Sequence, residues 1–272
     1  MSERFTDPAY LAEQYGDAER LRIRLETHAR YSENRGHFFD FLLGHLEARP
    51  DLVLLDVGCG HGAQHVRLRQ QRMRIVGLDR SPGMLAEARA QAREARLDVR
   101  LCRGDAERIP LGDASVQRVM ANHMLYHVPD RRAALREMRR VMAPGGRIVL
   151  GTNAADNGRR LIALHNALAA KLGYEVPPTL YDRFNLGHLS RVQEIFPTAK
   201  LKVRHDAFVF PDAPSAIRYY ASALLDHVEP RPADDGHRHA LLQLMVPEIQ
   251  TIIDTEGVFR VPKNAGCFVA EI

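Results

Sequence analysis

Short apolar runs alternate with amphipathic segments through the middle of the chain. Each run contains several aliphatic residues and is too short for a helix with a buried face. The segments between the runs carry apolar residues at helical spacing. Strands that alternate with helices favour a parallel sheet with right-handed connections, so an α/β core is predicted over residues 50–152. The five predicted strands cover residues 53–57, 73–78, 98–102, 116–121 and 147–151.

Helical periodicity dominates on both sides of this core. Residues 8–48 repeat apolar positions at helical spacing and are expected to form an N-terminal cover. Residues 153–198 and 212–256 are expected to be helical insertions, whereas residues 199–211 and 257–272 read as the last strands. The chain contains no internal repeat and no low-complexity tract, so the prediction is a single elaborated domain over its whole length.

The first apolar run ends in a turn that is rich in glycine. Asp56 is followed by Gly58, Gly60 and Gly62 in the sequence Asp-Val-Gly-Cys-Gly-His-Gly. Glycine permits positive φ and lets a ligand approach the bare backbone, and the helix that follows would point its free N–H groups at the same place. This turn is therefore expected to bind a ligand rich in polar oxygens. Dinucleotide-binding proteins use a related turn, but their third glycine lies one position later.

Polar residues also end the next three runs. The second run ends in Asp79, the third in Gly104-Asp105-Ala106, and the fourth in Asn122. A carboxylate at the tip of the second strand of such a unit is placed to accept hydrogen bonds from ribose hydroxyls. The ligand is therefore predicted to be a nucleoside.

Taken in order, these features resemble the class I S-adenosylmethionine-dependent methyltransferases, most closely the small-molecule (type 11-like) group. The resemblance covers residues 50–152 directly, and residues 257–270 resemble the closing hairpin of the same fold. It implies a Rossmann-like, doubly wound α/β fold whose seven-stranded sheet is parallel except for one antiparallel strand in the C-terminal hairpin. The resemblance rests on the glycine turn, Asp79, Asp105, the segment 122–130 and Pro144-Gly145-Gly146.

The same resemblance implies that S-adenosylmethionine is the cofactor and S-adenosylhomocysteine the product. Asp56 is then expected near the methionyl ammonium, Asp79 at the ribose hydroxyls and Asp105 at the adenine amino group. Two alternatives stay open: Asp79 and Asp105 could only cap the helices that follow them, and Met84 could belong to the core. The full set of predicted cofactor-binding residues is Tyr31, Asp56, Gly58, Gly60, Asp79, Arg80, Met84, Asp105, Ala106 and Asn122.

Three residues after the fourth run are predicted to carry the chemistry, namely His127, Tyr126 and His123. They follow the carboxyl end of a strand, where ligands of open α/β folds bind. An imidazole with a pKa near ~6.5 can remove a proton from a hydroxyl or an amine. For His127 the alternative is a structural role, in which it orders its own loop. His61 and His65 are four residues apart, as are His123 and His127, but no obvious carboxylate completes either pair, so no metal site is expected.

Composition limits the class of protein. The chain has 272 residues, 45% of them hydrophobic, which is enough to bury a full core. No stretch approaches the ~20 apolar residues that span a bilayer, and the N-terminus lacks an apolar signal core, so a cytoplasmic protein is expected. Three scattered cysteines make no disulfide framework. The net charge of +4 comes with arginine clusters on predicted amphipathic helices, where they usually form a solvated face, so no nucleic-acid partner is expected.

The predicted function is methyl transfer from S-adenosylmethionine to an oxygen or nitrogen of a small-molecule acceptor, by direct SN2 displacement, in a monomer or homodimer. The N-terminal helices, the loop at residues 181–185 and Tyr219 are expected to cover the cofactor and wall the acceptor cavity. An RNA or protein methyltransferase and a non-catalytic S-adenosylmethionine-binding module remain as alternatives. A nicotinamide dehydrogenase is disfavoured by the glycine spacing and by Asp105.

Overall fold

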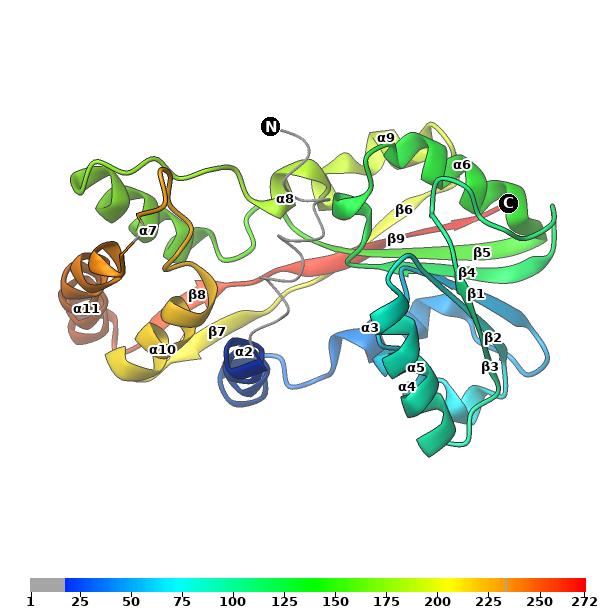
Figure 1. The fold of residues 1–272 in the computed structure, drawn as a ribbon, viewed down its shortest axis with the longest axis horizontal. Helices are drawn as coiled ribbons and strands as arrows, with labels where there is room; N and C mark the ends of the chain where they lie inside the picture. Colours follow the sequence, from blue (N-terminus) through cyan, green and yellow to red (C-terminus); the bar gives the residue numbers. More distant parts are fainter. Residues whose placement is uncertain (1–17, 233) are drawn as a thin grey trace.

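The computed structural model describes residues 18–232 and 234–272, which form an α/β core and a second, mainly helical lobe (Figure 1). Seven strands of the core make one sheet in the order β3-β2-β1-β4-β5-β9-β6. Strands β1 to β5 are parallel, and β9 runs antiparallel to both of its neighbours. The seven strands are β1 (Val53–Val57), β2 (Arg74–Asp79), β3 (Val99–Arg103), β4 (Val116–Asn122), β5 (Met142–Asn153), β6 (Lys200–Arg204) and β9 (Ala265–Glu271).

Helices cover both faces of this sheet, because neighbouring residues of a buried strand point to opposite sides. Leu54 of β1 packs in a cluster with Leu42 of α3, whereas Leu55 packs in another cluster with Met138 of α6. The predicted doubly wound fold with one antiparallel strand is thereby confirmed. The helical segments of the core are α3 (Phe38–Leu46), α4 (Ala63–Arg67), η2 (Arg69–Gln71), α5 (Pro82–Glu94), η3 (Leu125–His127), α6 (Arg131–Val141), α8 (Leu180–Arg183), η4 (Leu186–His188) and α9 (Leu189–Gln193).

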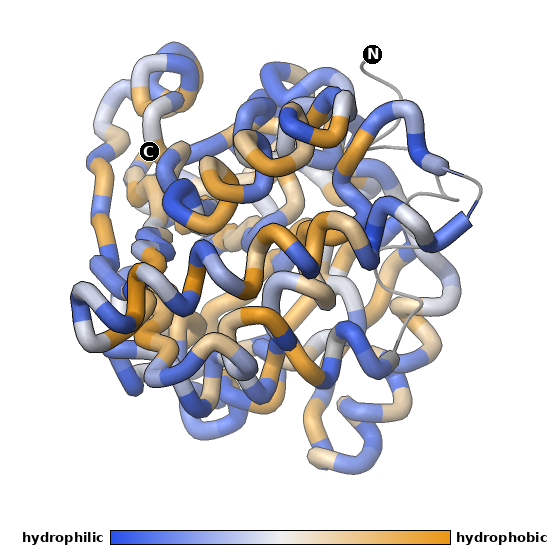
Figure 2. The backbone as a smooth tube through the Cα atoms, turned by 90° about the vertical axis from the view of Figure 1, so that its left-hand side faces the viewer, coloured by the Kyte–Doolittle hydropathy of each residue, from blue (hydrophilic) through white to orange (hydrophobic). Residues whose placement is uncertain are grey.

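The second lobe has a hydrophobic core of its own, separate from the two clusters on the sheet. Figure 2 faces this lobe, and apolar and polar residues mix along its nearest helices. Tyr220, Phe210 and Phe259 are among its largest fully buried side chains. The lobe contains α2 (Ala18–Tyr31), α7 (Arg159–Lys171), α10 (Ala213–Ala223) and α11 (Gly236–Glu256), together with the antiparallel pair β7 (Ala207–Phe210) and β8 (Phe259–Pro262).

Two expected strands are divided between the core and the lobe. The strand-like residues 199–210 form β6 in the main sheet and β7 in the lobe, and His205-Asp206 separates them. Lys263-Asn264 interrupts the partner strands β8 and β9 at the same level. The expected insertion at residues 153–198 is divided as well, since α7 joins the lobe whereas α8, η4 and α9 pack on the sheet. Helices α10 and α11 lie within the expected insertion at residues 212–256, and the lobe also takes in two short strands and α2. The fifth strand also begins earlier than expected, at Met142 rather than Arg147, with a register shift against β4.

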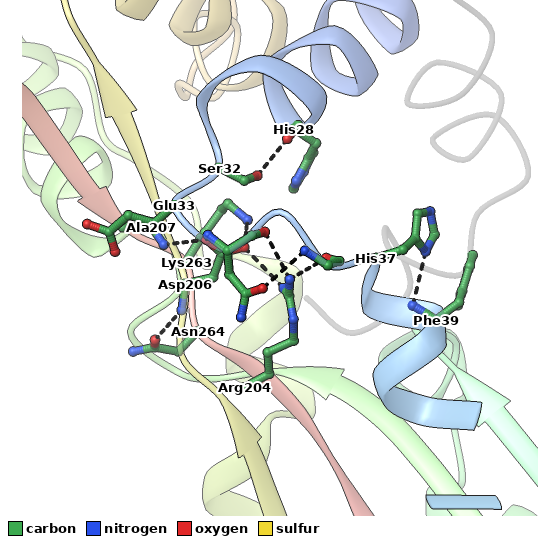
Figure 3. Close-up of polar contacts among 12 residues, drawn as sticks. His28, Ser32, Glu33, His37, Phe39, Arg204, Asp206, Ala207, Lys263 and Asn264 are labelled. Atoms are coloured by element: carbon green, nitrogen blue, oxygen red, sulfur yellow. Dashed lines mark hydrogen bonds and ion pairs between the residues drawn. The ribbon is translucent and has the colours of Figure 1, made fainter. Parts of the chain in front are cut away.

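Asp206 ties the N-terminal segment to this junction (Figure 3). Its buried carboxylate accepts hydrogen bonds from the backbone N–H groups of Asn34, at 3.0 Å, and Ala207, at 2.8 Å. It also pairs with Lys263 and Arg204. The expected N-terminal cover is thus split at this point: α2 packs on α10 and β7 of the lobe, whereas α3 packs on β5 and β9 of the sheet. The earlier part of the predicted cover, including Tyr15, lies outside the described residues.

Candidate active site

The glycine turn after β1 adopts the conformation that its composition predicts. Gly58 has a φ of 69° and Gly60 a φ of 54°, in the left-handed region that favours glycine. A Cβ atom on Gly58 would lie only 2.8 Å from the Cβ and Cγ atoms of Met124. A Cβ atom on Gly60 would meet nothing within 4 Å. The turn is therefore closely packed at its start and open at Gly60, where a ligand can approach the backbone.

Asp79 joins the tip of β2 to this turn. Its Oδ2 atom accepts a hydrogen bond from the N–H of Gly60, at 2.9 Å, and its Oδ1 atom accepts one from the N–H of Ser81, at 2.8 Å. Helix α5 is capped by Ser81, whose hydroxyl accepts from the N–H of Met84. Because Ser81 is the cap, the capping alternative for Asp79 is wrong. A carboxylate has about four acceptor positions, so Asp79 can hold the turn and still accept from two ribose hydroxyls.

Asp56 lies below the turn and is fully buried. Its Oδ2 atom accepts hydrogen bonds from Gln64, at 2.7 Å, and from the Nε2 atom of His65, at 2.8 Å. Within the described chain, its Oδ1 atom has no hydrogen-bond partner. Leaving a buried acceptor without a donor costs free energy. A ligand ammonium that donates to Oδ1 would remove this cost, so the predicted contact with the ligand depends on this atom.

The residues assigned to the adenine end lie at the carboxyl ends of β2 and β3. Asp105 is exposed and begins a turn rather than a helix, accepting at Oδ1 from the N–H of Glu107 at 3.0 Å. The capping alternative for Asp105 is therefore also wrong. Ala106 is buried beneath it, Met84 is half-buried in the first turn of α5, and Arg80 is exposed. Their cofactor contacts remain predictions.

Asn122 and His123 form the tip of β4. The Oδ1 atom of Asn122 is buried and has no partner among residues 18–232 and 234–272. His123 has a φ of 51°, a conformation that residues other than glycine rarely adopt. Such strained residues cluster at functional sites. Two observations therefore fit S-adenosylmethionine at this edge of the sheet. The buried Oδ1 atoms of Asp56 and Asn122 have no partner among the described residues, and the backbone of Gly60 is open to a ligand.

The three residues proposed for catalysis differ in their surroundings. Tyr126 is buried in the sheet core, and the His127 ring packs edge-on against it at 4.6 Å between centroids. The backbone N–H of His127 donates to Met124 within η3. These contacts fit the structural alternative for His127. His123 is half-buried, its ring lies tilted against that of Phe38 at 5.2 Å between centroids, and burial lowers its pKa to about 4.

The lobe contains one predicted cofactor residue and one residue that the sequence did not single out. Tyr31 packs at 5.3 Å against Phe210, which groups it with the core of the lobe rather than with the glycine turn. His28, one turn earlier on α2, has its pKa lowered to about 4, first by burial and then by the charge of Lys263. No motif marks His28, because only the fold brings α2 to this place.

Two features are absent from residues 18–232 and 234–272. No group of three or more His, Cys, Asp and Glu side chains in this part is arranged to hold a metal ion. None of the helices in the same part is both long and apolar enough to cross a membrane.

Residues 55–150, which include the glycine turn, Asp79 and the tip of β4, match the family model of a methyltransferase domain. The chain carries a class I S-adenosylmethionine-dependent methyltransferase domain. Two relatives agree with this assignment. The chain is 36% identical to 27-O-demethylrifamycin SV methyltransferase of Amycolatopsis mediterranei over 115 residues. The matched residues are 41% of this chain and 42% of that protein. It is 37% identical to demethylmenaquinone methyltransferase of Beutenbergia cavernae over 105 residues, which are 39% of this chain and 42% of that protein.

The match to these two relatives spans less than half of their length. Solved structures resemble more of the chain. The YcgJ protein of Bacillus subtilis is similar over 86% of this chain and 97% of its own, with a TM-score of 0.53 at 19% identity. The cyclase SpnF is similar over 93% and 96%, with a TM-score of 0.54 at 18% identity. Likeness at this identity shows the fold alone.

Proposed function

We propose that this protein transfers a methyl group from S-adenosylmethionine to an oxygen or nitrogen of a small-molecule acceptor. The observation that carries the proposal is the contact between Asp79 and the N–H of Gly60, at 2.9 Å. It joins the tips of β1 and β2 where nucleosides bind in open α/β folds. The relatives named for rifamycin and menaquinone precursors favour a small molecule over RNA or protein.

Each part of the site has a task in this reaction. When bound, S-adenosylmethionine supplies a methyl group that its sulfonium already activates. The chain has to bind the nucleoside through Asp79, hold the methionyl end near Asp56 and Asn122, and exclude water. Positioning two reactants in this way can supply ~7 to 11 kcal/mol of the barrier. The second lobe is joined to the sheet through Asp206, and we assign to it the walls of the acceptor site.

Titration calorimetry with S-adenosylmethionine, S-adenosylhomocysteine and NAD tests the cofactor assignment. Binding of the first two ligands, and none of NAD, is the expected result. Binding of NAD alone would overturn it.

A second assay follows methyl transfer from labelled S-adenosylmethionine to a metabolite extract, with tRNA and total protein as parallel acceptors. Label in small molecules is expected. Label confined to RNA or protein would replace the proposal with the corresponding macromolecular methyltransferase. Cofactor binding without labelled product in any fraction would indicate a binding module. The cytoplasmic location and the monomeric or dimeric state remain predictions.

A further inference from the structure

Three buried polar side chains form a network beneath the glycine turn. Asp56 lies in β1, and Gln64 and His65 lie in α4, directly after the turn. Their exposed fractions are 0%, 6% and 1%. The Oδ2 atom of Asp56 accepts hydrogen bonds from both α4 side chains, at 2.7 Å and 2.8 Å. One carboxylate oxygen is therefore held by two donors, whereas Oδ1 has no partner among the described residues.

The imidazole of His65 sits in space that two glycines leave open. A Cβ atom on Gly62, in the turn, would lie 3.0 Å from its Nδ1 atom, and one on Gly77, in β2, would lie 3.2 Å from its Cε1 atom. Gly77 is also the residue that pairs with Asp56 between β1 and β2. A glycine inside a strand often marks such a close approach. The third glycine of the turn thus makes room for a histidine, and the ring is held beside Asp56.

Gln64 connects the same carboxylate to the turn itself. Its Nε2 atom donates to Asp56 and, at 3.5 Å, to the carbonyl oxygen of Cys59. That carbonyl also accepts from the backbone N–H of Gly62, at 3.0 Å. An ionised carboxylate only accepts hydrogen bonds, so the Nε2 atom of His65 carries the hydrogen in the other contact with Asp56. The orientation of Asp56 is therefore set by two donors from one short helix.

We propose that His65 and Gln64 are positioning residues, which hold Asp56 so that its Oδ1 atom receives the α-ammonium group of S-adenosylmethionine. This inference rests on the proposed function, and it says which residues make the site select a ligand with an amino group. An ammonium group has hydrogens to donate, whereas the ligand's own carboxylate would be repelled by Asp56. Among residues 18–232 and 234–272, no lysine or arginine forms an ion pair with Asp56. Pairing with the ammonium would give this buried carboxylate a cationic partner.

Calorimetry with two ligands that differ in one group tests the positioning role. The first ligand is S-adenosylhomocysteine, and the second is its deamino analogue, in which hydrogen replaces the α-amino group. Both keep the adenine, the ribose and the carboxylate, so a defect elsewhere in the site weakens both alike. Because hydrogen bonds to charged groups are strong, the full-length wild type should bind S-adenosylhomocysteine roughly 10-fold or more tightly than the analogue. We call this ratio of dissociation constants the amino preference.

Substitutions of His65 separate positioning from folding. His65→Leu leaves Oδ2 of Asp56 with Gln64 alone, so the amino preference should fall by roughly fivefold, while the affinity for the deamino analogue stays within twofold. His65→Gln retains an N–H donor near the place of Nε2 and should keep most of the preference. The matched control is His165→Leu, which removes a buried histidine that bonds to Tyr220 in the lobe, and it should lower stability but not the preference. An unchanged preference in His65→Leu, or an equal loss for both ligands, would overturn the proposal.

Nitrogen NMR of the imidazoles gives a second measurement on the wild type, which decides the matter if His65→Leu does not fold. The Nε2–H signal of His65 should shift when S-adenosylhomocysteine is added and stay in place with the deamino analogue, because only the former brings a charge to Asp56. Equal shifts with both ligands, or none with S-adenosylhomocysteine, would refute the positioning role. A wild type that binds neither ligand would refute the proposed function and this inference together, whereas binding of both without an amino preference would refute the inference alone.

Discussion

Replacing Asp79 by alanine tests the central contact of the cofactor site. The structure gives this carboxylate two backbone partners, the N–H groups of Gly60 and Ser81, at 2.9 Å and 2.8 Å. The proposed function adds the ribose hydroxyls. Asp79→Ala therefore removes a ligand contact and loosens the turn that surrounds the ligand.

The two effects have separate magnitudes. A hydrogen bond to a charged group is worth ~1.5 to 3 kcal/mol, so loss of the ribose contact should weaken S-adenosylmethionine binding by roughly 10- to 150-fold. The free energy of unfolding without ligand should fall by only about 1 to 3 kcal/mol, because water can replace the carboxylate at this half-buried site. Asp79→Asn retains an acceptor oxygen for Gly60 and should fall between the wild type and the alanine variant.

Calorimetry measures the affinity, and urea unfolding of the free protein measures stability. Asp98→Ala is the matched control, since this exposed aspartate lies just before β3 at the opposite end of the sheet. It should change neither quantity. A folded Asp79→Ala protein with wild-type affinity would refute the cofactor site, and an equal loss in Asp98→Ala would show that net charge, rather than the contact, sets the affinity.

Three further predictions concern the turn, the junction and pH. Gly58→Ala should cost ~1 to 3 kcal/mol of stability by overpacking and reduce cofactor affinity, whereas Gly112→Ala, whose Cβ would meet nothing within 4 Å, should do neither in the same two assays. Asp206→Ala should lower the free energy of unfolding by about 3 to 5 kcal/mol, because it leaves a buried lysine without its partner; an unchanged urea midpoint would contradict this. The folded pKa values of His28 and His123, about 4, lie below the unfolded value, so the unfolded state binds more protons between pH 4 and 6.5. Stability should therefore fall as pH is lowered through that window, and His123→Asn should reduce this slope in urea unfolding curves.

Local patterns in the sequence determined the core of this protein. The five apolar runs and the helices between them predicted a right-handed parallel sheet, and the structure has β1 to β5 in that arrangement. The sequence also predicted the glycine turn and the position of Asp79. Glycine permits the positive φ that the turn needs, and a carboxylate directly after the second apolar run marks a strand tip. Such features depend on residues only a few positions apart, so they can be predicted from the local sequence.

The tertiary structure alone decided how the lobe is built and which residues meet at its junction with the sheet. Nothing local in residues 199–210 shows that the strand breaks at His205-Asp206, because the break is fixed by partners far along the chain, Asn34 and Lys263. The division of the N-terminal helices depends on the same contacts. His28 carries no motif, and only the fold brings α2 against β7, where the His28 ring packs on Phe208 at 4.8 Å between centroids. Hydrogen bonds and charges act through space, so residues distant in sequence acquire a shared chemistry only after the chain has folded.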